Sequence, residues 1–269
     1  MRRRYTKMSA AVRIAAFAVT ISAGAVLSSV SMVHADDAHA RVLFKEMSRY
    51  LAAQKSISFD YDSSIEAVSA SFQKFSFTSS GTVRLDRPDK IRVTRKGGFA
   101  DVEMVFDGKT LTALGKNKGI FVKTEMPGSI DEMIDNVRLN SGFSAPGADL
   151  LLNNVYDTLI PDVVEAIDLG TGVVRGVTCD HLAFRNEMVD WELWIAEGAN
   201  PYPCKYVVTS KLTVQAPQYS VEISGWKTGS EVAGDDFTFK NSTGAKEVKI
   251  EDFVGMDEMP DPSIEGDVQ

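Results

Sequence analysis

Between residues 56 and 239, apolar and polar side chains alternate along most of the chain. A period of two places successive side chains on opposite faces, so each such segment is predicted to be a β-strand with one buried face. We predict about six strands between residues 56 and 122, and further strands at 163–169, 173–185, 190–196, 205–214, 219–223 and 237–239. Asp107 and Gly108 form a strong hairpin signal within the first group. Strands that follow one another in this way favour an antiparallel sheet over alternating βαβ units.

Three segments break the alternation, because their apolar residues recur with the spacing of a helix. We predict helices at 37–54, 129–137 and 150–160. Asp36 or Asp37 can cap the first helix, and Ser129 forms a capping box with Glu132 at the start of the second. The fold class is therefore α+β, with a large antiparallel sheet. We expect the three short helices to pack inside the curve of this sheet as a lid or plug over its apolar face.

The first 35 residues have the three parts of a cleavable signal peptide. Residues 1–7 form a basic head, and residues 14–30 form an uncharged apolar stretch. Small residues then precede a cleavage site that we predict after Ala35. An uncleaved membrane anchor is the alternative interpretation, because the apolar stretch is long enough to allow one. The Ser and Gly content of the stretch favours cleavage, and hence export to the periplasm.

Export makes the chain markedly acidic. The full chain has 29 Lys and Arg against 37 Asp and Glu, a formal net charge of −8. Because the signal carries five basic residues and no acidic one, its removal lowers the net charge to −13. This balance argues against electrostatic binding to nucleic acid or to an anionic membrane surface. We expect one domain over residues 36–253 and an acidic, disordered tail at 254–269, which has two prolines and little apolar content.

Helices this short can leave the apolar face of the sheet incompletely covered. A cavity between sheet and helices would suit an acyl chain or another lipid-like ligand. A completely filled core is the alternative, because native interiors normally pack densely. The candidate cavity residues are large side chains of the predicted strands and helices, namely Phe59, Tyr61, Phe75, Phe77, Val93, Met104, Phe106, Val122, Ile130, Met133, Leu193 and Ile195.

Local motifs in the second half of the chain resemble a known family. The motifs are Cys179-Asp180-His181-Leu182-Ala183-Phe184-Arg185, Asp190-Trp191-Glu192-Leu193-Trp194-Ile195, Pro201-Tyr202-Pro203, Pro217-Gln218-Tyr219 and Trp226. Together with the order of elements, they resemble a family of predicted periplasmic proteins of unknown function within the superfamily of bacterial lipoprotein-localisation carriers (LolA/LolB-like). The resemblance covers residues 38–253 and implies an unclosed β-barrel with a helical lid, that is, a single LolA-like half-barrel domain. It implies handling of hydrophobic ligands or lipoproteins, and no catalytic machinery.

Patterns for catalysis or metal binding are weak. His181 beside Asp180 is the first candidate for acid–base chemistry, but adjacent residues of a strand point to opposite faces. Cys179 and His181 share a face and could both reach a metal, yet no CxxC or HxxxH motif supplies further ligands. A Gly-x-Ser-x-Gly elbow and a phosphate-binding loop are also missing from the sequence. We therefore predict a protein that is not an enzyme and uses neither a cofactor nor a metal.

Cys179 and Cys204 are the only cysteines, and an exported protein can oxidise such a pair to a disulfide. If one strand separates their two strands, their Cα atoms lie about 9.5 Å apart in a flat sheet. A disulfide needs roughly 4.4–6.8 Å between those atoms. Cys204 could still fold over from the turn before its strand, so both the bonded and the free state stay open.

The leading hypothesis is a monomeric, non-enzymatic periplasmic protein that binds a lipid or the acyl chains of a lipoprotein, and no nucleic acid. The second hypothesis is a sensor or partner-binding module of the cell envelope, with a filled core and a tryptophan-bearing surface. Trp191 and Trp194 point to opposite faces of one strand, which leaves one of them for such a surface. A hydrolase built around His181 is the third hypothesis.

Overall fold

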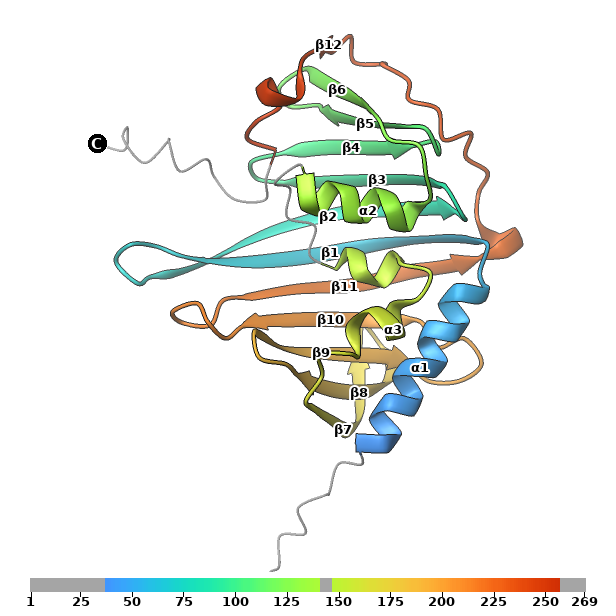
Figure 1. The fold of residues 1–269 in the computed structure, drawn as a ribbon, viewed down its shortest axis with the longest axis vertical. Coiled ribbons are helices and arrows are strands. Elements are labelled where there is room, and N and C mark those ends of the chain that lie inside the picture. Colours follow the sequence, from blue (N-terminus) through green and yellow to red (C-terminus); the bar gives the residue numbers. More distant parts are fainter. Residues whose placement is uncertain (1–36, 141–146, 257–269) are drawn as a thin grey trace, which may run out of the picture. The chain divides into compact units, whose positions relative to one another are not determined.

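The computed structural model describes residues 37–140 and 147–256. In this part of the chain, twelve strands form one sheet in the order β12-β6-β5-β4-β3-β2-β1-β11-β10-β9-β8-β7 (Figure 1). Neighbouring strands are antiparallel except β12 and β6, which are parallel. The edge strands β12 and β7 do not pair with each other, so the sheet is unclosed. The predicted α+β class is confirmed, whereas the predicted signal peptide and residues 257–269 lie outside the described residues.

Most elements have the predicted type. The strands are β1 (Ser56–Val68), β2 (Lys74–Asp86), β3 (Lys90–Gly97), β4 (Asp101–Phe106), β5 (Thr110–Gly115), β6 (Ile120–Glu125), β7 (Glu165–Val174), β8 (Val177–Arg185), β9 (Val189–Ala196), β10 (Pro203–Ser210), β11 (Gln218–Thr228) and β12 (Lys246–Glu247). The helices are α1 (Asp37–Ala53), α2 (Ile130–Asn140) and α3 (Val155–Leu159), with 3₁₀ turns η1 (Ala148–Leu151), η2 (Gly229–Glu231) and η3 (Ile250–Asp252). The strand predicted at 173–185 is divided, because Arg175 and Gly176 have positive φ and form a tight hairpin turn.

The long β1–β2 hairpin joins the two halves of the sheet. Its thirteen residue pairs run along both strands without a register shift. Strand β2 continues into the meander β3–β6, while β1 pairs along its other edge with β11. In the middle of the hairpin, the ring of Tyr61 lies over Gly81, and its hydroxyl donates a hydrogen bond to the Thr94 carbonyl at 3.0 Å. A side chain at position 81 would collide with both groups, which explains the glycine in a strand interior.

Helix α1 packs one face against strands β7, β8 and β9. Its buried apolar residues are Ala40, Phe44, Met47 and Leu51. Their spacing of three or four residues produces a single apolar stripe. The carboxylate of Asp37 accepts a hydrogen bond from the Ala166 backbone N–H at 3.0 Å, which fixes the start of the helix to β7. A hydrogen bond from Arg41 holds the pKa of Asp37 below its ordinary value.

Helix α2 begins with the predicted capping box. The Ser129 backbone N–H donates to the Glu132 carboxylate at 2.7 Å, and the Glu132 N–H donates to the Ser129 hydroxyl at 3.2 Å. These bonds satisfy backbone donors that a helix start leaves without partners. The helix extends to Asn140, beyond the predicted end at residue 137. In Figure 1, α2 lies across the strands of the first half of the sheet.

The third predicted helix, 150–160, is divided into η1 and α3. Asn154 starts α3 as its N-cap, because its side chain accepts a hydrogen bond from the Asp157 N–H. Asparagine favours caps over helix interiors, so the chain restarts a helix here instead of continuing one. Arg87 ties η1 to the sheet by donating to the carbonyl of Leu151 at 2.9 Å. No helix within residues 37–140 and 147–256 is long and apolar enough to cross a membrane.

The prediction of a short strand at 237–239 is wrong. The Asp235 carboxylate accepts a hydrogen bond from the Phe237 N–H at 2.7 Å, and Phe237 has a φ of 49°. A left-handed φ and a backbone donor bonded to a side chain are both incompatible with a regular strand. Hydrogen bonds from Arg92 hold Asp235 in place and keep its pKa below the ordinary value. The last strand is β12 instead, which runs beside β6.

Candidate ligand pocket

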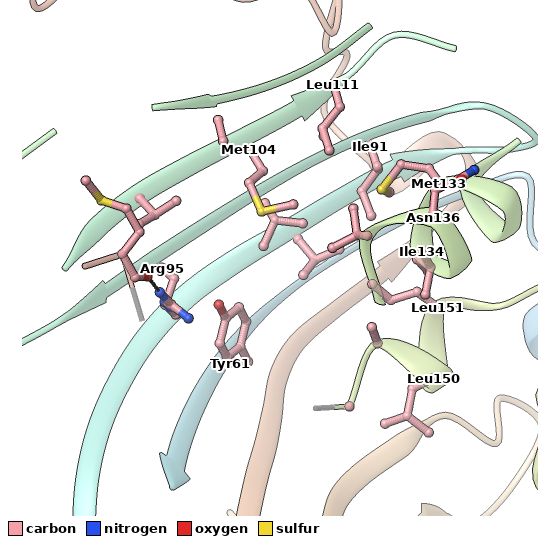
Figure 2. A pocket seen from close by; sticks show the side chains of 18 of the residues that line it. Tyr61, Ile91, Arg95, Met104, Leu111, Met133, Ile134, Asn136, Leu150 and Leu151 are labelled. Carbon is pink, nitrogen blue, oxygen red and sulfur yellow. Dashed lines mark hydrogen bonds between the residues drawn. The ribbon is translucent and has the colours of Figure 1, made fainter. Parts of the chain in front are cut away.

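An apolar pocket of about 450 Å³ lies between the sheet and the helices. Its floor comes from strands β1–β6 and β11, and its roof from α2 and η1 (Figure 2). The floor exists because residues in register on neighbouring strands share one face of the sheet. The central row of this floor crosses β1 to β6 through Phe59, Val83, Val93, Met104, Ala113 and Val122. All of these side chains line the pocket, and Ala113 is the smallest of them.

The rows on either side of the central one differ in how densely they are filled. Beneath α2, the row of Ile57, Leu85, Ile91, Phe106 and Leu111 includes several fully buried side chains and forms packed core. On the other side, the row runs through Tyr61, Gly81, Arg95, Val102 and Gly115. Its two glycines carry no side chain, and the ring of Tyr61 and the side chain of Met256 lie over them. The pocket therefore extends from the packed core toward this second row.

The roof repeats the apolar character of the floor. Its apolar residues are Met133, Ile134, Val137, Leu150 and Leu151. On α2 these positions follow the three- and four-residue spacing of a helical stripe. Asn136 also lines the roof, and its side-chain amide donates to the Glu132 carbonyl at 2.8 Å. Polar side chains are thus a small minority of the lining.

The C-terminal part of the described chain contributes residues to the lining of the pocket. Phe253 and Met256 line the pocket and are almost completely buried. Two cationic side chains hold the segment by its backbone. The guanidinium of Arg95 donates to the Met256 carbonyl, and the ammonium of Lys118 donates to the Val254 carbonyl at 2.8 Å. Of the first residues of the predicted tail, Met256 therefore packs against the pocket, whereas Val254 is exposed.

The candidate cavity residues fall into three groups. Those that line the pocket are Phe59, Tyr61, Val93, Met104, Val122 and Met133. Those in the packed core beside it are Phe106, Ile130, Leu193 and Ile195. Phe75 and Phe77 lie outside it on β2, toward the tip of the β1–β2 hairpin, where Phe77 meets Phe99 edge-on with ring centroids 5.6 Å apart. They share the inner face of β2, but the tip of the hairpin extends beyond the described helices α1, α2 and α3 (Figure 1), which the alternation of side chains cannot reveal.

The residues that β11, the C-terminal segment and Arg95 contribute to the pocket are not among the cavity residues predicted from the sequence. Tyr219, Val221 and Ile223 of β11 line the pocket. Arg95 is in phase with Ile91 and Val93 on β3, so the alternation itself places it on the inner face. Residues 250–256 carry no such signal, because their place at the pocket depends on tertiary packing.

His181 lies outside this pocket. Its Nε2 is 2.7 Å from the Glu192 carboxylate, and its ring stacks on Trp194 with centroids 3.9 Å apart. Asp180 faces the other way, where burial and the nearby Glu197 raise its pKa. Across residues 37–140 and 147–256, no group of three or more His, Cys, Asp or Glu side chains is arranged to hold a metal ion.

Cys179 and Cys204 lie on β8 and β10, on either side of β9. Both are buried thiols in one small apolar cluster. Cys204 occupies a break in the β9–β10 register between Pro203 and Lys205, and the two thiols are within hydrogen-bonding reach of each other. Burial raises the pKa of both thiols. The disulfide stays a prediction.

The fold and the pocket define an α+β domain with an unclosed antiparallel sheet and an apolar pocket roofed by short helices. The chain belongs to the DUF2092 family of predicted periplasmic proteins, which it matches over residues 40–251. The family resemblance inferred from the motifs between Cys179 and Trp226 is thereby confirmed. No curated protein matches this chain in sequence.

Several solved structures are similar to this one at low sequence identity. Lipoprotein LppX of Mycobacterium tuberculosis is 10% identical, with 71% of this chain and 96% of LppX covered and a TM-score of 0.41. LprF of Mycobacterium bovis is 12% identical, with coverages of 76% and 100% and a TM-score of 0.42. A LolA superfamily protein of Nitrosomonas europaea is 10% identical, with coverages of 75% and 98% and a TM-score of 0.36.

Proposed function

We propose that this protein is a non-enzymatic periplasmic protein that binds a hydrophobic ligand, a lipid or the acyl chains of a lipoprotein, in the pocket between the sheet and the α2–η1 roof. The observation that carries this proposal is the pocket of about 450 Å³ with an almost wholly apolar lining. Its volume falls within the range of about 300–1,000 Å³ that is typical of ligand sites. Burying an acyl chain there would gain about 0.8 kcal/mol for each methylene group removed from water.

Filling the pocket should abolish binding while the fold survives. Ala113 lies in the middle of the central row, between Met104 and Val122. In the Ala113→Phe variant, the new ring would occupy the space of the ligand, so we expect the affinity for a fluorescent fatty acid to fall at least tenfold, or about 1.4 kcal/mol. Fluorescence titration measures the affinity, and thermal unfolding checks the fold. Ala70→Phe, in the exposed β1–β2 turn, is the matched control and should bind like the unmodified protein.

Native mass spectrometry of protein purified from the periplasm tests the same proposal without a probe. We expect a lipid adduct on the unmodified protein and on Ala70→Phe, and none on Ala113→Phe. If the unmodified protein carries no lipid and also fails to bind the fluorescent fatty acid, the proposal is wrong.

One surface favours the alternative, a module that docks a protein partner. The tips of the β1–β2 and β10–β11 hairpins lie side by side, because the Gln215 side-chain amide donates to the Phe72 carbonyl at 2.6 Å. Phe72 is 61% exposed and Leu212 is 70% exposed, and Phe75 and Val214 beside them are also exposed. Adjacent exposed apolar side chains are typical of interaction surfaces. The pocket argues against the filled core that this alternative assumes. The partner-docking module is therefore the second proposal, after ligand binding.

The alternative predicts a complex that depends on these tips. Combining Phe72→Ser with Leu212→Ser should remove a stoichiometric partner from the purified protein, as measured by size-exclusion chromatography with mass spectrometry of the complex. Val42→Ser, on the exposed face of α1, is the control and should retain the partner, as should Ala113→Phe. An unmodified protein that elutes alone at its own mass would argue against the alternative.

A further inference from the structure

We propose that the head group of the ligand is uncharged and rich in hydroxyl groups, and that it binds in a second, polar pocket beside the apolar one. This inference rests on the proposed function and adds the chemistry and the place of the head group to it. The second pocket has a volume of about 370 Å³ and is formed by strands β1, β9, β10 and β11 and by residues of η1 and α3. Gly147 and Tyr219 line both pockets, so the two pockets adjoin.

The hydroxyl of Tyr206 is the main observation behind this inference. The side chain is only 3% exposed, and no residue within 37–140 and 147–256 forms a hydrogen bond with its hydroxyl. In the same part of the chain, Arg87 Nε is the only fully enclosed side-chain polar atom that lacks a partner. The Tyr206 hydroxyl therefore opens onto the second pocket, which the residue lines. A ligand that bonds this hydroxyl would satisfy a buried polar group that the protein itself leaves without a partner.

Carboxylates supply acceptors in the lining of the second pocket. They belong to Glu66, Asp149 and Asp162, and no described Lys, Arg or His side chain lines the pocket with them. Arg138 pairs with Oδ1 of Asp149 at 2.7 Å, and Lys74 pairs with Oε2 of Glu66 at 3.0 Å. Two of the three negative charges are thus compensated by side chains that do not line the pocket. An oxyanion head would face carboxylates and no lining cation, which is unfavourable.

The same lining also contains hydrogen-bond donors. Burial and the nearby Asp149 raise the pKa of Tyr206, so its hydroxyl stays protonated and can donate as well as accept. Ser210 adds a second hydroxyl. The Asn186 carboxamide accepts from the Val189 N–H through Oδ1 at 2.8 Å, which leaves its own N–H donors for other groups. An ammonium head has donors only and cannot use these groups, whereas each hydroxyl of a polyol both donates and accepts.

The register of the sheet places this polar pocket next to the apolar one. Tyr206 on β10 is paired with Val221 on β11, and Val221 lines the apolar pocket. Side chains of directly paired residues lie about 5 Å apart on one face of a sheet. An acyl chain that lies in the apolar pocket and ends at Val221 would therefore bring its head group to Tyr206.

The test compares monopalmitoylglycerol with methyl palmitate, which has the same chain without hydroxyl groups, as competitors of bound cis-parinaric acid. We expect the unmodified protein to bind monopalmitoylglycerol about tenfold more tightly than methyl palmitate. Tyr206→Phe removes only the hydroxyl group. It should weaken monopalmitoylglycerol about threefold or more, leave methyl palmitate unchanged and not lower the melting temperature. Tyr156→Phe is the matched control and should change neither affinity, because this tyrosine lies on α3 outside both pockets.

Further competitors of similar chain length test the chemistry of the head group. Hexadecyl glucoside and monopalmitoylglycerol should both bind more tightly than methyl palmitate, and the stronger of the two separates a sugar head from a glycerol head. Palmitoyl lysophosphatidic acid carries an anionic head, and hexadecylamine carries a cationic head. We expect each of these charged amphiphiles to bind at least about threefold more weakly than monopalmitoylglycerol.

Each outcome decides between explanations. If cis-parinaric acid does not bind and no competitor raises the melting temperature, the proposed function fails together with this inference. If methyl palmitate and monopalmitoylglycerol bind equally well to the unmodified protein and to Tyr206→Phe, the protein binds acyl chains but the head-group inference is wrong. Tighter binding of either charged amphiphile also overturns it, as does a Tyr206→Phe variant that weakens both ligands and melts at a lower temperature. Loss of affinity for monopalmitoylglycerol alone, at an unchanged melting temperature, supports the inference.

Discussion

Replacing Phe44 by alanine should lower the free energy of unfolding by about 3–5 kcal/mol, the usual cost of truncating a fully buried aromatic side chain. Phe44 is 0% exposed on the sheet-facing side of α1. Its ring lies 5.3 Å from that of Tyr156, 5.4 Å from that of Phe184 and 5.4 Å from that of Trp191, measured between centroids. The substitution would leave a cavity where the helix, α3 and the sheet meet. Urea denaturation followed by circular dichroism measures the loss.

The matched control lies on the same helix. Val42 is 50% exposed on the opposite face of α1, so Val42→Ala should change the free energy of unfolding by no more than about 0.5 kcal/mol. A loss below about 1 kcal/mol for Phe44→Ala would mean that the domain folds without firm packing of α1, contrary to the structure. The free energy of unfolding of a typical domain is only about 5–15 kcal/mol, so the expected loss for Phe44→Ala is a large share of the stability.

Oxidation of Cys179 and Cys204 to a disulfide should raise the free energy of unfolding by about 3 kcal/mol, because the bond would close a loop of roughly 26 residues in the unfolded chain. Two thiols would lose two protons and two electrons to an oxidant such as glutathione disulfide. The oxidised protein would be lighter by two hydrogen atoms, which intact mass spectrometry detects, and it would unfold at a higher urea concentration than the reduced protein.

The raised pKa values of both thiols set the conditions of this experiment. The thiolate is the reacting species, so burial should make oxidation of the folded protein slow. Oxidation should be much faster during refolding from urea, before the cluster around the thiols is buried. Cys179→Ala with Cys204→Ala is the control, since its stability should not respond to the oxidant. A refolded protein that still reacts with two equivalents of a thiol reagent would show that no bond forms.

The alternation of apolar and polar side chains predicted most strands correctly, because it depends directly on the burial of one face of the sheet. The alternation predicted the strands before and after residues 128–160, and the capping box of Ser129 and Glu132 predicted the start of α2. Its failure at 237–239 has a local cause, since the Asp235 carboxylate takes the backbone donor that a strand would need. The helix predicted at 150–160 is divided at Asn154, which caps α3. Asparagine is a common cap residue, but the helical spacing of the apolar residues around it predicted one continuous helix.

The pocket was harder to predict because its boundaries depend on which parts of one face the helices cover. Phe59 and Phe77 lie on paired strands and face the same side, yet only Phe59 is beneath the roof. Arg95 is not among the predicted cavity residues, because a charged residue within an apolar alternation suggests an exposed end of a strand. The three-dimensional arrangement shows it at the end of the pocket instead, with the C-terminal segment over it.

The pairing of β1 with β11 also governs the order in which this domain can assemble. Strand β1 is among the first parts of the described chain to leave the ribosome or a translocation channel, and β11 is among the last. The β1–β6 meander can form from neighbouring segments, whereas the β1–β11 ladder must wait until nearly the whole chain has emerged. Contacts between such distant segments carry a high entropic cost of loop closure and slow folding. During that interval the free edge of β1 exposes unpaired backbone groups, which makes the half-formed sheet the stage most vulnerable to aggregation.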